Sequence, residues 1–147
     1  MEKGCHGFRS FITLVARVCI SAIFIIAGVT KIVQYHAMAG MLANMGMPSA
    51  NWLLILAIVF ELGGGLLVFF GWFARFGAFL LFVFVIVATF LFHSFWNFQG
   101  ADAANQTYHF LKNLSILGGL LYVMACGADC FSLDGIRHRA KHQMPKE

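Results

Sequence analysis

Charge is scarce in this sequence: only 11% of its 147 residues are Asp, Glu, Lys or Arg, whereas 61% are hydrophobic. A soluble domain has roughly a quarter charged residues and about half apolar ones, and a chain this short keeps much of its surface exposed. The composition therefore excludes a water-soluble globular domain, and its high apolar content also excludes a disordered chain. Because proline is rare and no Pro/Gly/Ser-rich linker is present, we expect a single membrane domain over residues 1–147.

Long apolar runs make up most of the chain. A helix that crosses about 30 Å of hydrocarbon needs about 20 mostly apolar residues, and the runs that meet this requirement are residues 11–33, 52–70, 75–93 and 108–126. We therefore predict an all-α fold, an integral membrane four-helix bundle, with the lipid bilayer as a partner. A basic tail at residues 127–147 follows the last run.

Lys and Arg are absent from two of the connecting segments, residues 34–51 and 94–107. Seven of them lie in the N-terminal arm, in the turn at residues 71–75 and in the C-terminal tail. Because Lys and Arg are enriched on the cytoplasmic side of membrane proteins, both termini are predicted to be cytoplasmic. No nucleic-acid partner is expected, since the basic residues flank the membrane instead of forming a folded basic face.

The few polar residues in the spans recur at steps of three and four, which places them on one face of each helix. Such faces predict a polar core between the helices, with the apolar remainder turned toward lipid. The candidate residues of this core are Arg17, Lys31, Glu61, Arg75, His93, Lys112, Asn113 and Ser115.

Glu61 lies at the midpoint of the second span, where an unpaired charge is costly, so it is either paired or protonated. At a rise of 1.5 Å per residue, Arg17 lies about 5 Å from the level of Glu61. We therefore expect an Arg17–Glu61 ion pair, with Lys112 approaching Glu61 from the outer side. Two interpretations of Glu61 stay open, because such a pair can form a functional site or can simply fix helix register.

Common redox and metal motifs are lacking. The six His residues show no HExxH or similar ligand spacing, so no metal site is expected. No nucleophile–base–acid set can be assembled, so catalytic residues are unknown. The cysteines form no CxxC motif and lie in or near the predicted cytoplasmic half, where thiols stay reduced. A structural disulfide is therefore not expected for Cys5, Cys19, Cys126 and Cys130.

The order of the polar residues resembles that of the DoxX family. Arg17, Gly28 and Lys31 are similar to its R…G..K pattern, and residues 61–64 with Gly71 and Arg75 are similar to its E-x-G…G-x-x-x-R stretch. Further matches to the family pattern lie at residues 93–96, 112–115 and 132–134, so the resemblance covers roughly residues 11–136. One departure is residues 127–130, which read Gly-Ala-Asp-Cys where the family usually has a Gly-Pro-Gly-like stretch.

The resemblance implies a small multi-pass protein of the bacterial inner membrane. The family takes its name from subunits associated with a thiosulfate:quinone oxidoreductase and terminal oxidase. We therefore expect a redox-associated membrane subunit that binds a partner membrane or redox protein. Quinone is the cofactor that this resemblance suggests. Whether it is an enzyme or a non-catalytic, quinone-binding subunit stays open. The alternatives are a scaffold for a partner protein and a small permease or proton pathway through the polar core.

Overall fold

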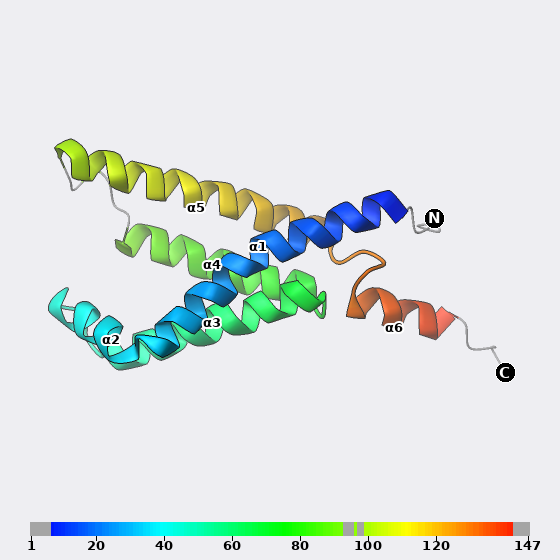
Figure 1. Ribbon diagram of the computed structural model, residues 1–147, viewed down its shortest axis with the longest axis horizontal. Coiled ribbons are helices and arrows are strands. Elements are labelled where there is room, and N and C mark those ends of the chain that lie inside the picture. The colour runs from blue at the N-terminus through cyan, green and yellow to red at the C-terminus, as the bar shows by residue number, and fades with distance from the viewer. Residues whose placement is uncertain (1–6, 93–95, 97–98, 143–147) are drawn as a thin grey trace.

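A computed structural model of the protein describes residues 7–92, 96 and 99–142. Four helices in this part of the chain are long and apolar enough to cross a membrane. These helices are α1 (Gly7–Val33), α3 (Ala50–Phe70), α4 (Ala74–Phe92) and α5 (Gly100–Cys126). Two shorter helices, α2 (Tyr35–Asn44) and α6 (Leu133–His142), follow α1 and α5 (Figure 1). The predicted all-α membrane bundle is confirmed.

The helix bounds differ most from the predicted spans at α5, which begins at Gly100 instead of residue 108. The added residues include Asp102 and Asn105, so an apolar window does not detect them. The short helices α2 and α6 lie in segments that were predicted only as a connection and a tail. Hydropathy therefore locates the membrane crossings but not the helical extensions beyond them.

The four long helices pack in the order α1, α3, α4, α5, and each has its main contacts with the next in this order. Helices α1 and α5 have little contact with each other. They approach near Ile20 and Gly119, where a Cβ on the glycine would lie 2.7 Å from the Ile20 Cδ1 atom. Toward the end of the bundle that carries α2, they diverge (Figure 1). The bundle is therefore open along one side of α5.

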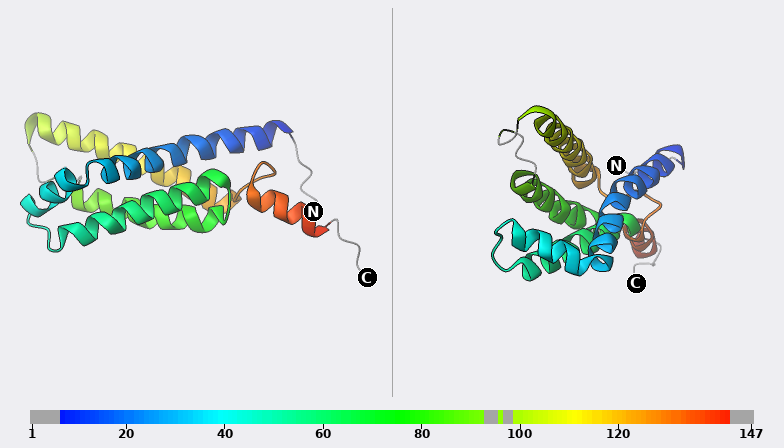
Figure 2. Two further views of the ribbon diagram at one scale, coloured as in Figure 1. Left: turned by 60° about the horizontal axis from the view of Figure 1, so that its bottom comes forward. Right: turned by 60° about the vertical axis from the view of Figure 1, so that its left-hand side comes forward.

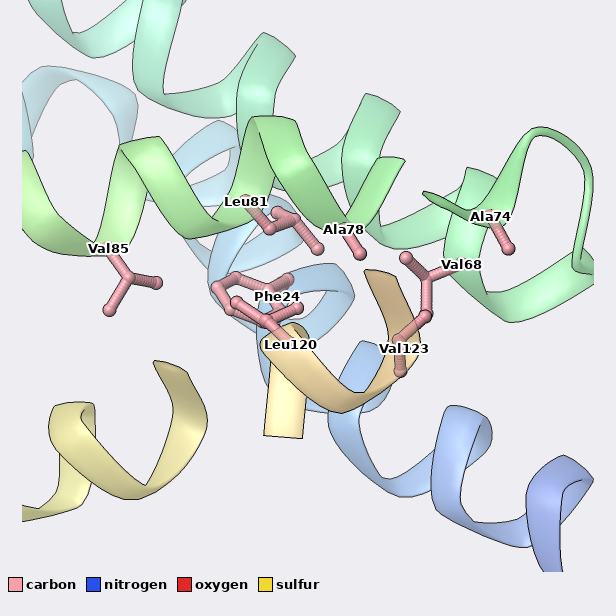
Figure 3. Close-up of a cluster of buried hydrophobic side chains, with 8 residues drawn as sticks. All are labelled: Phe24, Val68, Ala74, Ala78, Leu81, Val85, Leu120 and Val123. Atoms are coloured by element: carbon pink, nitrogen blue, oxygen red, sulfur yellow. The ribbon is translucent and has the colours of Figure 1, made fainter. Parts of the chain in front are cut away.

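The hydrophobic core contains residues from all four long helices (Figure 3). Close backbone approach is greatest between α3 and α4, because a Cβ on Gly77 would lie 3.0 Å from the carbonyl oxygen of Gly64. Small residues at such contacts are typical of helix packing in membranes. The buried residues of this cluster are Phe24, Val68, Ala74, Ala78, Leu81, Val85, Leu120 and Val123.

Large apolar side chains cover the outside of the bundle. Val59 of α3 is 60% exposed, and Phe79 and Phe90 of α4 are also exposed. A surface of this kind is unsuited to water and suits the hydrocarbon of a bilayer. The start of α1 and helix α6 lie at the same end of the bundle (Figures 1 and 2). On which side of the membrane this end lies stays a prediction from the Lys and Arg count.

Candidate functional site

Glu61 is paired with Lys31. The Lys31 Nζ atom lies 2.9 Å from each oxygen of the Glu61 carboxylate, and it donates hydrogen bonds to both. Glu61 is buried in the middle of α3, whereas the Lys31 side chain, in the last turn of α1, is 24% exposed. The pair neutralises a charge that would be costly in the bilayer. The Lys31 side chain nevertheless stays partly exposed.

The predicted Arg17–Glu61 pair is wrong, and the reason is the register of α1 against α3. A Cβ on Gly28 would lie 2.7 Å from Leu62 Cγ, so these two residues share a level in the bundle. Arg17 lies eleven residues before Gly28, which is about 16 Å along α1. The depth estimate counted each helix from its own end and therefore missed the stagger between them.

Arg17 is buried at the end of the bundle that carries α6. Its Nη2 atom donates a hydrogen bond to the carbonyl oxygen of Phe131, in the segment after α5. The guanidinium packs against Gly71 in the turn between α3 and α4, and any side chain at position 71 would overlap it. Among the residues that the structure describes, none forms a hydrogen bond with its Nε or Nη1 atom. Arg17 thus links α1, the α3–α4 turn and the segment that leads into α6.

Asp134 adds two hydrogen bonds between the start of α6 and the turn that joins α3 to α4. Its backbone N–H donates to the carbonyl oxygen of Gly71 at 3.1 Å, and its carboxylate accepts from the N–H of Ala74 at 3.4 Å. A carboxylate at the first residue of α4 satisfies a backbone donor that has no partner within the helix. The first turn of α6 is therefore fixed to the start of α4.

Two other predicted residues connect α4 with α5. Arg75 Nη2 donates to the carbonyl oxygen of Ala125 at 3.2 Å. Near the opposite end, Asn113 Nδ2 donates to Thr89 Oγ1 at 2.8 Å. Thr89 was not among the candidate residues, although it is the one hydroxyl residue in the apolar run 75–93. That isolation was the signal that could have identified it.

Lys112 and Ser115 are exposed and do not join the buried polar groups. Lys112 Nζ lies 3.3 Å from His109 Nδ1 on the same helix, and Ser115 Oγ donates to the carbonyl oxygen of Leu111. His93 lies outside the described residues. The polar residues therefore form separate centres around Glu61, Arg17 and Asn113, with core residues such as Leu81 and Leu120 buried in the same bundle.

The polar side of α5 is turned outward. Only Leu120 and Val123 of this 27-residue helix are buried. A Cβ on Gly118 would meet no atom within 4 Å. We call the exposed side of α5 the α5 face, and it consists of Tyr108, Lys112, Ser115, Gly118 and Tyr122. The sequence pattern placed Lys112 and Ser115 of this face in the polar core and thus predicted that they point into the bundle.

The cysteines also differ from expectation. Cys19 and Cys126 are free and exposed, but Cys130 is disulfide-bonded. The expectation that no disulfide would form is therefore wrong for Cys130. It rested on a cytoplasmic position for this end of the bundle, where thiols stay reduced.

Comparison with known proteins places these centres in a family context. The sequence model of the DoxX family matches residues 12–94, more than half of the chain, and the match includes Arg17, Lys31 and Glu61. The chain belongs to the DoxX family. The family domain of this DoxX-family protein therefore contains buried Arg17, the Lys31–Glu61 ion pair and the close contact between α3 and α4. No solved structure matches the chain.

Two relatives come from Escherichia coli (strain K12). Inner membrane protein YqjF is 37% identical over 86% of this chain and 92% of its own length. Inner membrane protein YphA is 29% identical over 86% of this chain and 90% of its own length. A Surfeit locus protein 4 homolog of Schizosaccharomyces pombe (strain 972 / ATCC 24843) is 30% identical over 88% of this chain, but over 38% of its own length. With its four spans, the DoxX-family protein is a multi-pass protein of the inner membrane, as predicted.

Proposed function

We propose that this protein is a non-catalytic subunit of a redox-associated membrane assembly, which binds a transmembrane helix of a partner protein on its α5 face. The single observation that carries the proposal is the exposure of this face. It contains Lys112, Ser115 and Gly118, whereas the apolar sides of the same helix provide its few buried residues. In a bilayer, polar and small residues are typical of contacts between helices and not of contacts with lipid.

The chemistry of the α5 face favours a different protein over a second copy. Two copies that insert in the same direction are related by an axis along the membrane normal, which places equivalent residues opposite each other. Lys112 of one copy would then face Lys112 of the other, and this like-charge contact is unfavourable. A partner helix with a carboxylate or a carbonyl at this level would instead accept from the ammonium, while Gly118 allows close backbone approach.

The redox part of the proposal rests on the family, whose name comes from subunits associated with a quinone-linked oxidoreductase. The chain supplies no recognisable redox centre in its sequence, so the partner or a quinone would carry the electrons. This division of labour agrees with the subunit role. A permease is less favoured, because the described polar residues lie in separate centres instead of along one path.

A quinone site at Lys31 is a second candidate, and one observation favours it. The ammonium has three donors, and Glu61 accepts from it on one side while the side chain remains 24% exposed. A quinone carbonyl could accept a hydrogen bond from the remaining N–H at this level of the bilayer. Lys31 would then orient the quinone ring, and Glu61 would hold the ammonium in position.

Site-specific photocrosslinking tests the partner. A photoreactive residue in place of Ser115 on the α5 face is compared in native membranes with one in place of Val59, which is exposed on α3. We expect position 115 to give one discrete product at high yield with an oxidoreductase subunit, and position 59 to give none. A product with a second copy of this chain, with a protein of no redox function, or equal yields at both positions would contradict the proposal.

Quinone retention tests the second candidate. Protein purified in mild detergent is extracted with organic solvent, and its quinone content is compared for Lys31→Met and Lys112→Met. We expect loss with Lys31→Met and retention with Lys112→Met, because of these two lysines only Lys31 combines a buried carboxylate partner with a partly exposed side chain. Equal quinone content in the two variants, or none in the unaltered protein, would contradict a site at Lys31.

A further inference from the structure

An apolar groove lies between the outer side of α3 and the first residue of α6. Its volume is about 410 Å³, and its lining residues are Gly63, Leu66, Leu67, Phe70, Trp72 and Leu133. The side chains of Leu66, Phe70, Trp72 and Leu133 are each 43–53% exposed, so the groove opens toward the surroundings of the bundle. No lining residue carries a charge. The groove therefore suits a hydrocarbon occupant.

A cation lies one helical turn from this groove. Leu133 and Arg137 are four residues apart on α6, which places them on the same side of the helix, and Arg137 is exposed. Helix α6 extends beyond the turn between α3 and α4 (Figure 1). At a rise of 1.5 Å per residue, Arg137 lies about 6 Å farther along α6 than Leu133. The segment 133–142 contains one acidic residue, Asp134, and its carboxylate accepts a hydrogen bond from the N–H of Ala74.

We propose that this groove and Arg137 form a binding site for an anionic phospholipid. One acyl chain lies in the groove against Leu67 and Phe70, and the phosphate accepts hydrogen bonds from the Arg137 guanidinium. Arginine binds phosphate through two parallel hydrogen bonds, and a cation at the membrane surface attracts anionic lipids. Trp72 lines the groove just after the end of α3. This position suits the boundary between hydrocarbon and headgroups, where an indole ring is favoured.

The size of the groove favours a lipid over a partner helix. A helix has a diameter of about 10 Å, so a volume of about 410 Å³ holds only about one helical turn. An acyl chain is narrower and can follow the whole groove. The position of Arg137 beyond the apolar part also matches a molecule with a long apolar tail and an anionic head.

Fluorescence quenching tests this site in the full chain. Trp52 and Trp96 are replaced by Phe, which leaves Trp72 as the sole tryptophan. The protein is reconstituted in vesicles of phosphatidylcholine that contain brominated-chain phosphatidylglycerol or, at the same mole fraction, brominated-chain phosphatidylcholine. Bromine quenches Trp72 only from close range, so the ratio of the two quenching strengths reports the preference for the anionic lipid at this groove.

Two pairs of variants separate the head and the chain of the lipid. Arg137→Gln removes the cation, and its control is Arg9→Gln, an exposed arginine in the first turn of α1. The start of α1 lies at the same end of the bundle as α6 (Figure 1). Gly63→Leu fills the groove, and its control is Gly40→Leu on α2. A Cβ at either glycine would meet no atom within 4 Å, so both variants are expected to fold.

We expect about a fivefold preference for the anionic lipid, as one basic residue at the membrane surface provides. Arg137→Gln abolishes the preference, and Gly63→Leu weakens quenching by both lipids, while both controls behave as the parent does. Equal quenching by the two lipids in the parent, or a preference that survives Arg137→Gln, would overturn the proposal. A loss of the same size in Arg9→Gln or Gly40→Leu would also overturn it, because general surface charge or general loosening would then explain the effect.

Discussion

Helices α3 and α5 are both membrane spans, but they are used differently. Helix α3 lies between α1 and α4 and buries Glu61, two glycines, Leu54 and Val68. Helix α5 is longer, has more polar residues, and buries only Leu120 and Val123. The less apolar span is thus the one left more exposed, the reverse of what a self-sufficient bundle in lipid would show. The α3 side therefore supplies most of the helix packing, whereas the α5 side leaves polar residues exposed.

The largest difference between the two sides is expected for their lysines. Lys31→Met leaves the buried Glu61 carboxylate without its cation, and removal of one partner from a buried ion pair costs about 3–5 kcal/mol. Lys112→Met on α5 removes only an exposed contact with His109 and should cost less than about 1 kcal/mol. The free energy of unfolding, measured by titration with SDS in mixed micelles, checks both values.

A double variant is the control for this comparison. Lys31→Met combined with Glu61→Gln removes both charges and should recover more than half of the loss, because no unpaired carboxylate remains. If Lys31→Met and Lys112→Met have equal effects, the proposed difference between the two sides is wrong.

An intermediate effect is expected for glycine substitutions. Gly77→Ala places a Cβ 3.0 Å from the Gly64 carbonyl oxygen and 2.7 Å from Leu67 Cβ, and overpacking of this kind costs about 1–3 kcal/mol. Gly118→Ala meets open space and gains helix propensity of up to about 1 kcal/mol. Thermal unfolding in one detergent should therefore show a lower Tm for the first variant and an unchanged or higher Tm for the second. The opposite order would show that α3 and α4 do not pack this closely.

The smallest effect is expected for the hydrogen bond between Asn113 of α5 and Thr89 of α4, which joins the two sides of the bundle. Thr89→Val removes the hydroxyl that accepts from Asn113 and should cost about 0.6 kcal/mol and at most about 1.7 kcal/mol, the range for such bonds in membranes. Thr30→Val is the matched control, since both hydroxyls bond to a carbonyl four residues earlier, and of the two only Thr89 has a described hydrogen bond with another helix. Hydrogen exchange of α5 amides should increase in Thr89→Val alone. An equal increase in both variants would show that α5 is held without this bond.

The fold could be predicted from the sequence as far as hydropathy determines it. Each span is a continuous apolar run, so its existence and approximate bounds follow from the cost of placing polar groups in lipid. Helix α2 has only ten residues, too few to cross a bilayer, and α6 lies in a polar tail. Nothing in an apolar window distinguishes such helices from loops.

The candidate residues were identified more accurately than their partners. Arg17, Lys31 and Glu61 stand out because charges are rare in apolar helices, and the structure places all three in defined contacts. Their pairing depends on the stagger of α1 against α3, which is set by how Gly28 accommodates Leu62. The direction of the α5 face was wrong for a related reason, since periodicity shows which residues share a face but not which neighbour covers it.

The hydrogen bond between Arg17 and Phe131 joins residues that are 114 positions apart, and this has a consequence for biogenesis. At a synthesis rate of about 5–20 residues per second, the carbonyl that binds Arg17 is made between about 6 and about 23 seconds after the arginine itself. During that interval the first helix holds its guanidinium without its final acceptor. Completion of this contact therefore has to wait until translation has passed α5, so a segment made after α5 closes the structure around α1.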